Sequence, residues 1–341
     1  MPKVTKRGVV DIGRMCHLNC LHCFHRFSDY HCYGHVQESK KLLKDVIREI
    51  DALVAQKREF VSFTGGEPLI YPKFSEILSY ALDRGLRPEI ITAGHFKNAQ
   101  KVVKRFGKKK IDWLISLHGS PIMHNYICND KTAWDQFVGT LFIIDGSYFR
   151  INTVFLSFNY LSLHELYYMH FPLLFNNRDY PNPITPKAKL KKPAQINFIK
   201  WRPFYGWIGR ADRKDRPHDE LIKQYMYRRD KGIAEYTDII FDIISEAMRF
   251  CNGINFRYFP KCEIDYAILE DKYNLKGKIK YWSTLNYMFD PWEWCNREIT
   301  PDEAIEIMQK KWTDRLYYKY GGVCKLCVES DNCEGWLQDY E

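Results

Sequence analysis

The stretch Phe60-Val-Ser-Phe-Thr-Gly-Gly-Glu-Pro68 contains the pattern that decides the fold. Its first four residues form an apolar run of the length of a buried strand, and the run leads directly into two adjacent glycines. Paired glycines let the backbone approach a ligand closely and adopt conformations closed to other residues. Their carbonyl groups can then accept hydrogen bonds from a ligand ammonium group. The stretch therefore predicts a strand followed by a binding turn.

Strand-like and helix-like segments alternate on both sides of this stretch. The strand-like segments are residues 8–12, 60–63, 89–92, 113–117, 150–157 and 195–201. Six strands with intervening helices predict an α/β fold with a parallel sheet. An open partial barrel and a doubly wound sheet both fit this pattern. In both architectures ligands bind at the carboxyl ends of the strands.

Three cysteines follow the first of these strands in the run Cys16-His-Leu-Asn-Cys20-Leu-His-Cys23. Three thiolates at this spacing can face one iron–sulfur cube and leave its fourth iron without a protein ligand. Zinc is the alternative metal and needs a fourth ligand, and unliganded core cysteines are a further alternative. The histidines that can complete a zinc site are His17, His22 and His25.

The composition favours metal binding by these cysteines. No run of 18 apolar residues and no signal-peptide pattern is found, so we expect a cytoplasmic protein without a membrane span. Thiols stay reduced in that compartment, and six of the eleven cysteines lie in two tight groups, which indicates metal sites rather than disulfides. The formal net charge of +9 fits anionic partners and a solvated basic surface equally well.

Taken together, these residues resemble the radical S-adenosylmethionine (SAM) superfamily. Two further segments carry the resemblance, Ile91-Thr92-Ala93-Gly94 after the third strand and Ile115-Ser116-Leu117-His118-Gly119 after the fourth. The resemblance covers about residues 8–205 and implies a partial (β/α)6 barrel. It also implies an enzyme whose SAM-binding 4Fe–4S cluster is held by Cys16, Cys20 and Cys23.

The resemblance places the SAM contacts on the loops that follow the strands. His118 is a candidate for contact with substrate or SAM, and a structural histidine is an equal alternative. His22 stands where the family usually has an aromatic residue, and the fifth strand lacks a glycine-rich adenine motif, so the adenine contacts stay open. The implied SAM-binding residues are Thr64, Gly65, Gly66, Glu67, Pro68, Thr92 and Ser116.

A second cysteine group, Cys324-Lys-Leu-Cys327 with Cys333, lies near the other end of the chain. Its spacing alone fits zinc and iron–sulfur equally well. Beside the barrel it resembles the auxiliary-cluster region of the SPASM and twitch subfamilies, and we expect one auxiliary 4Fe–4S cluster. The expected fourth ligand is Cys262, which follows a strand-like segment at residues 254–258; Cys251 and Cys295 are the alternatives. We expect Cys32 and Cys128 to be small buried hydrophobes.

These expectations divide the chain into a barrel domain at residues 1–207 and an auxiliary-cluster domain at residues 208–341. The resemblance implies reductive cleavage of SAM to a 5′-deoxyadenosyl radical, which abstracts hydrogen from a substrate C–H bond. The outcome would be oxidation, epimerisation or bond formation, as in oxidoreductases and mutases. A low-potential electron donor such as flavodoxin or ferredoxin is the implied partner.

Two observations favour a small, anionic metabolite as the substrate. The chain is basic, and the fifteen residues before Cys16 are too few for a leader-recognition domain. A peptide- or protein-modifying maturase is the alternative. A zinc-stabilised nucleic-acid-binding protein is a competing class: it accounts for the charge and the cysteines but not for residues 64–68, so nucleic acid is not an expected partner.

Overall fold

The computed structural model describes residues 6–23, 41–156, 158–176, 190–200, 233–257, 279–282, 318–319 and 336–337. Its main element is a sheet of eight strands that stand in chain order, each parallel to its neighbour. The strands are β1 (Arg7–Asp11), β2 (Phe60–Thr64), β3 (Arg87–Thr92), β4 (Asp112–Ser116), β5 (Phe149–Phe155), β6 (Gln195–Lys200), β7 (Ile254–Arg257) and β8 (Ile279–Trp282). A separate antiparallel pair is formed by β9 (Tyr318–Lys319) and β10 (Trp336–Leu337).

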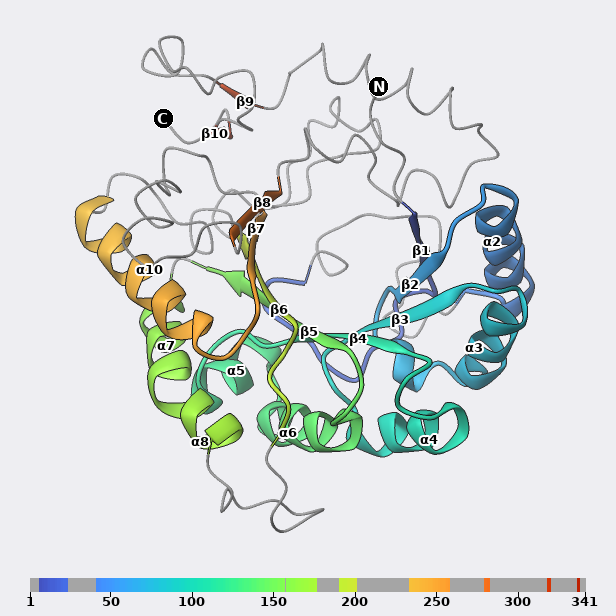
Figure 1. Ribbon diagram of the computed structural model, residues 1–341, viewed down its shortest axis with the longest axis horizontal. Coiled ribbons are helices and arrows are strands. Elements are labelled where there is room, and N and C mark those ends of the chain that lie inside the picture. Colours follow the sequence, from blue (N-terminus) through green and yellow to red (C-terminus); the bar gives the residue numbers. More distant parts are fainter. Residues whose placement is uncertain are drawn as a thin grey trace.

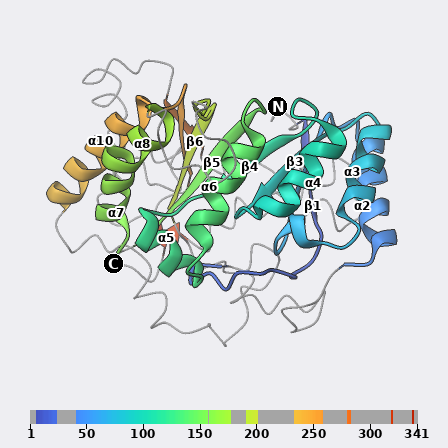
Figure 2. The ribbon, with the colours of Figure 1, turned by 90° about the horizontal axis from the view of Figure 1, so that it is seen from below.

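Helices follow the strands and lie along the outside of the curved sheet (Figures 1 and 2). Because the strand order never reverses, the helices lie on one side, which excludes the doubly wound alternative and gives a partial barrel. The helices are α2 (Leu43–Ala55), α3 (Phe74–Asp83), α4 (Phe96–Phe106), α5 (Pro121–Cys128), α6 (Ala133–Ile144), α7 (Tyr160–Glu165), α8 (Phe171–Asn176) and α10 (Ile233–Met248), with a 3-10 turn η2 (Pro68–Ile70) and a π-helical turn η3 (Leu166–His170).

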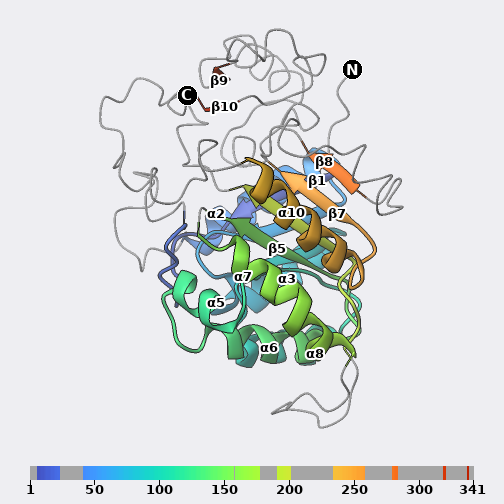
Figure 3. The same cartoon turned by 90° about the vertical axis from the view of Figure 1, so that its left-hand side faces the viewer.

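The sheet extends beyond the six strands that the sequence pattern predicts. After residue 207, α10 and then β7 and β8 continue the same parallel order. The reason is the apolar face of α10, where Ile240, Ile243 and Ile244 are buried in the core like residues of the earlier helices. Figure 3 shows α10 beside α7 over this end of the sheet. Residue 207 as a domain boundary stays a prediction.

The core lies between the sheet and its helices. Val46, Ile50 and Leu53 of α2 are buried there, and the Phe63 ring of β2 packs edge-on against Phe74 of α3 with centroids 5.7 Å apart. Each buried aliphatic or aromatic side chain of this kind stabilises the fold by about 1.5–3 kcal/mol. The apolar packing that stabilises the barrel therefore lies on the outer, helix-covered face of the sheet. The concave face can carry polar and charged side chains.

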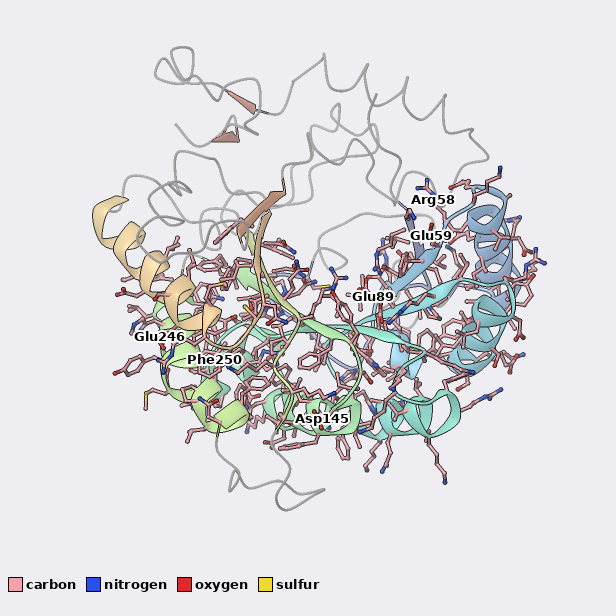
Figure 4. All side chains as sticks on the ribbon, viewed as in Figure 1. Arg58, Glu59, Glu89, Asp145, Glu246 and Phe250 are labelled. Atoms are coloured by element: carbon pink, nitrogen blue, oxygen red, sulfur yellow. The ribbon has the colours of Figure 1, made fainter. Side chains whose placement is uncertain are left out.

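The concave side carries a buried charge cluster. Glu89 of β3 accepts a hydrogen bond from Ser62 Oγ at 2.8 Å, and its Oε2 lies 2.8 Å from Arg7 Nη1. Its other oxygen pairs with Arg150 of β5. Figure 4 shows Glu89 inside the curve of the sheet, whereas Glu246 and Phe250 lie on its outer side. One carboxylate of β3 thus contacts three other strands, β1, β2 and β5.

In the described part of the chain, no helix is long and apolar enough to cross a membrane.

Candidate functional site

The sequence motifs meet at one edge of the barrel. The cysteine run follows β1, the glycine pair follows β2, and Ala93 and Leu117 follow β3 and β4. Because these strands are parallel and adjacent, their carboxyl ends share one edge. The structure therefore brings the predicted site segments together, as the sequence pattern indicates.

The glycine turn is bonded directly to the cysteine loop. Gly66 N donates to Gly13 O at 2.6 Å, and Glu67 N donates to Met15 O at 2.8 Å. A Cβ atom on Gly66 would lie 2.1 Å from the Met15 carbonyl oxygen, and one on Gly65, where φ is +122°, would lie 2.4 Å from Gly13 O. The backbone of the glycine turn therefore approaches that of residues 13–15 too closely for any side chain at positions 65 and 66. The sequence alone did not reveal this contact.

Glu67 joins this turn to the end of β3. Its buried carboxylate accepts hydrogen bonds from Leu69 N at 3.0 Å, from Thr92 Oγ1 at 2.7 Å and from Ala93 N at 2.9 Å. Burial raises the pKa of Glu67 to about 7, although these three donors oppose the rise. Thr92 Oγ1 in turn accepts from Gly94 N at 2.9 Å. Both side chains therefore hold loops together, and their contact with SAM stays a prediction.

Cys16, Cys20 and Cys23 form no disulfide bonds and are partly exposed on a loop that is anchored at both ends. Beyond the glycine turn, Asn19 N and Leu21 N donate to the carbonyl oxygens of Cys128 and Ile127 at 3.3 and 2.8 Å. Hydrogen bonds to the glycine turn on one side and to α5 on the other therefore fix the backbone of the cysteine loop.

The surroundings of the thiols favour the protonated form when no metal is bound. Burial, and next the Glu67 carboxylate, raise the pKa of Cys16, while a hydrogen bond from Leu18 N to its sulfur at 3.4 Å opposes the rise. A hydrogen bond with the Cys128 thiol, and next burial, raise the pKa of Cys20. Metal binding at this loop must therefore release protons.

Three thiolates are the ligand set that a 4Fe–4S cube with one open iron requires. Among the described residues, no three His, Cys, Asp or Glu side chains lie close enough together to hold a single ion. The thiolates of a cube bind different irons and need not converge on one point. The chemistry of the loop thus fits the cluster that the sequence predicts.

Helix α5 contributes two residues that the sequence analysis did not place at this site, His124 and Cys128. His118 N donates to His124 Nδ1 at 3.2 Å, and the sulfur of Cys128 lies 3.8 Å from the same ring. The His22 ring packs edge-on against His118 with centroids 4.4 Å apart. In the sequence, Pro121 indicates the start of a helix, but α5 has only eight residues and shows no clear helical spacing of apolar residues. The positions of His124 and Cys128 could therefore not be predicted.

His118 lies inside this buried histidine stack. Its Nδ1 accepts a hydrogen bond from Val154 N at 3.2 Å, and its carbonyl accepts one from Asn159 Nδ2 at 2.8 Å. These contacts agree with the structural alternative for His118, and its contact with substrate or SAM stays a prediction. His22 packs against an imidazole here, as a planar aromatic residue would.

The stack makes stability depend on pH. Burial lowers the pKa of His124 to about 3, so between pH 6.5 and about 3 the unfolded chain binds a proton there that the folded chain does not. Stability is therefore lost as the pH falls below 6.5, by up to about 1.4 kcal/mol per pH unit for this group. Between pH 7 and pH 5, the free energy of unfolding of the metal-free wild type should fall by about 2 kcal/mol more than that of His124→Gln. Thermal unfolding of both proteins at the two pH values measures this difference.

His164→Gln is the matched control for this experiment. His164 is partly exposed on α7 and stacks on Tyr168 with centroids 5.8 Å apart, outside the buried stack. The control should respond to pH like the wild type. Equal losses in His124→Gln and in the wild type would contradict the assignment.

The residues of the expected auxiliary cluster, Cys262, Cys324, Cys327 and Cys333, lie outside the described residues, as do Cys32 and Cys295. Cys128 is buried, as expected for it. Cys251 is buried in the core, and its thiol donates to the carbonyl oxygens of Ala247 and Gly253 at 3.3 Å each. These contacts favour a structural thiol over the alternative of a cluster ligand.

Comparison with known proteins finds a family to which the first part of the barrel is similar. Residues 10–156 match the sequence model of the radical SAM superfamily. The chain is 36% identical over 90 residues to 7-carboxy-7-deazaguanine synthase from Methanocaldococcus jannaschii, a match that covers 24% of this chain and 37% of the relative. It is 26% identical over 152 residues to the S-adenosylmethionine-dependent nucleotide dehydratase of Flammeovirga pacifica, which covers 41% of this chain and 50% of the relative. These matches span half or less of each relative.

Solved structures share the fold. Native anSMEcpe with bound AdoMet and Kp18Cys peptide superposes with a TM-score of 0.56 at 16% identity, covering 97% of this chain and 89% of that one. Streptococcus suis SuiB bound to its precursor peptide SuiA gives a TM-score of 0.50 at 14% identity, covering 97% and 70%. Residues 10–156 are thus similar to the radical SAM superfamily, and the motif order and the fold agree with that similarity.

Proposed function

We propose that this chain is a radical SAM enzyme that abstracts hydrogen from a C–H bond of a small, anionic metabolite, leading to oxidation, epimerisation or bond formation. The observation that carries the proposal is the bonding of the glycine turn to the cysteine loop. Gly66 N and Glu67 N donate to the backbone of residues 13–15, directly before Cys16. A loop fixed in this way presents three cysteine thiols at the ligand-binding edge of a barrel.

When bound, the cluster and SAM supply a one-electron cleavage that yields methionine and a 5′-deoxyadenosyl radical. Residues of the chain itself position the loops that would bind the cluster and SAM. Glu67 fixes the β2 turn against the end of β3, and α5 fixes the cysteine loop from its other side. Ser116 at the end of β4 and the peptide groups of Gly65 and Gly66 are the SAM contacts that we propose.

The proposal includes one auxiliary 4Fe–4S cluster on Cys262, Cys324, Cys327 and Cys333, in a C-terminal region that begins near residue 208. It also includes a low-potential electron donor of the flavodoxin or ferredoxin type. A peptide is the second candidate substrate class, because anSMEcpe and SuiB, which share the fold at 16% and 14% identity, are solved with peptides bound.

Iron and sulfide analysis of anaerobically purified protein, with a visible spectrum, tests the proposal. The wild type should contain about eight irons, and the Cys16→Ala/Cys20→Ala/Cys23→Ala variant about four. With dithionite, the wild type should convert SAM to 5′-deoxyadenosine and the triple variant should not. Zinc in place of iron, without brown colour, would overturn the enzyme proposal, and about twelve irons would replace one auxiliary cluster by two.

Cys251→Ala is the matched control, because the buried Cys251 thiol already donates to two carbonyl groups. This variant should keep the iron content of the wild type. A loss of about four irons would make Cys251, rather than Cys262, the auxiliary ligand.

A further inference from the structure

The concave face of β5 and β6 is polar in the middle of the sheet. In β5, Phe149, Ile151, Thr153 and Phe155 are buried, whereas the residues between them are half-buried. β6 has the same alternation. The half-buried residues on the concave side are Arg150, Asn152 and Val154 of β5 and Gln195, Asn197 and Ile199 of β6. Polar groups at such positions need partners, either within the protein or from a ligand.

Three asparagines form a hydrogen-bonded row across this face. The dipeptide Ile-Asn recurs in β5, β6 and β7, and the strand register places Asn152 beside Asn197 and Asn197 beside Asn255. Asn255 Nδ2 donates to Asn197 Oδ1 at 2.7 Å, and Asn197 Nδ2 donates to Asn152 Oδ1 at 2.8 Å. Gln195 Nε2 donates to Asn255 Oδ1 at 3.4 Å. All three amides thus point in one direction along the row.

The row ends in an unused donor. The Oδ1 atom of Asn152 is taken by Asn197, whereas its Nδ2 group meets no acceptor at hydrogen-bond distance among the described residues. The strand register places Asn152 beside Ser116 of β4, the residue proposed to contact SAM. The free amide hydrogens therefore lie beside the proposed cofactor site.

The surroundings of Asn152 add positive charge. Arg150 lies two residues earlier on the same face and pairs with Glu89, and its buried Nε atom has no acceptor within the described part of the chain. Glu89 also pairs with Arg7, so one carboxylate serves two guanidinium groups. The nearby Asp112 is already bound by Arg87 at 2.6 Å. Among the described residues of this face, Arg7 and Arg150 thus share the Glu89 carboxylate, and two donors, Arg150 Nε and Asn152 Nδ2, lack an acceptor.

We propose that Asn152 determines substrate specificity by donating from Nδ2 to an oxyanion, a carboxylate or phosphate group, of the substrate. Asn197 and Asn255 hold the amide in its donating orientation, and Arg150 supplies the complementary charge. The inference rests on the proposed function and extends it by naming the recognised group and the residue that recognises it.

Binding measurements on the SAM-loaded holoenzyme test this inference, with inorganic phosphate, AMP, succinate and uncharged adenosine as probes. The wild type should bind at least one of the anions and bind adenosine more weakly. The phosphate-bearing probes and succinate distinguish a phosphate from a carboxylate ligand. Asn152→Asp replaces the donor by a carboxylate of equal size and should weaken anion binding tenfold or more, as expected for loss of a hydrogen bond to a charged group.

Thr153→Val is the matched control, because Thr153 lies on the opposite face of β5, where its hydroxyl lies 3.1 Å from Tyr167 Oη. It should bind the anion like the wild type. Equal affinity in Asn152→Asp and the wild type, or no anion binding by the wild type, would overturn the inference. A loss of SAM affinity in Asn152→Asp would assign the residue to the cofactor instead and would also overturn it. Failure of the proposed function is separately visible, as wild-type protein that makes no 5′-deoxyadenosine.

Discussion

Replacement of Gly66 by alanine should remove the iron bound at the N-terminal cysteine loop while the barrel stays folded. The added Cβ atom would lie 2.1 Å from the carbonyl oxygen of Met15 and 2.6 Å from its carbonyl carbon. Both are backbone atoms directly before Cys16 and cannot rotate away as a side chain can. The loops must separate, and the bonds from Gly66 N and Glu67 N to residues 13–15 are lost.

The expected result is a loss of about four irons per chain, as in the triple cysteine variant. SAM cleavage should fall about 100-fold or more, the size of effect that a displacement of about 1 Å produces in a positioned site. Iron analysis and far-ultraviolet circular dichroism, which reports the helices, measure the two parts of this prediction.

Gly107→Ala is the matched control. Gly107 ends α4 with φ at +80°, and a Cβ atom there would meet nothing within 4 Å. This variant carries backbone strain of about 1–2 kcal/mol but no steric contact with the site. It should keep its iron. Full iron content in Gly66→Ala would show that the contact between the two loops is not needed to hold the cluster.

Substitution of Glu89 by glutamine should lower the free energy of unfolding by about 3 kcal/mol or more. Glu89 is buried, and its two oxygens pair with Arg7 and Arg150, whose side chains are 32% and 13% exposed. A neutral amide removes the negative charge that Glu89 places beside two guanidinium groups, and removal of one partner from a buried ionic group costs about 3–5 kcal/mol. Thermal unfolding should show a midpoint lower by roughly 5 °C.

Glu59→Gln provides the comparison. Figure 4 shows Glu59 and Glu89 in one view, and the Lys6–Glu59 pair is exposed, at 67% and 52% of the two side chains. Loss of an exposed pair changes stability by less than about 1 kcal/mol. Similar midpoints for the two variants would mean that the cluster around Glu89 is not a structural element of the barrel.

The sequence predicted the first six strands and the placement of the motifs, because each motif follows an apolar run of strand length. The strand expected over residues 60–63 is β2, which the structure extends by one residue to Thr64, directly before the glycine pair. Between β5 and β6 the chain forms α7, the π-helical turn and α8 in succession. An extra residue in one turn leaves the apolar spacing nearly unchanged, so the sequence does not reveal it.

Other features depend on contacts between distant segments and could not be read from spacing. β7 was expected beside the auxiliary cysteines, but α10 returns the chain to the sheet and β7 pairs with β6. The Ile-Asn dipeptides of β5, β6 and β7 stand more than 40 residues apart, and only the register shows that Asn152, Asn197 and Asn255 are neighbours. The structure places the glycine pair against the cysteine loop, but the backbone of that loop, which requires glycine there, was visible only in three dimensions.

The anchoring of the cysteine loop to α5 has a consequence for the order of events during synthesis. Leu21 N and Asn19 N donate to the carbonyl oxygens of Ile127 and Cys128, about 105 residues later in the chain than the thiols themselves. At ordinary translation rates the ribosome needs roughly 5–20 s to make that stretch. During this interval the cysteine loop lacks its two hydrogen bonds to α5. A cluster bound by the three thiols would gain this support only after α5 has left the ribosome and folded against the loop.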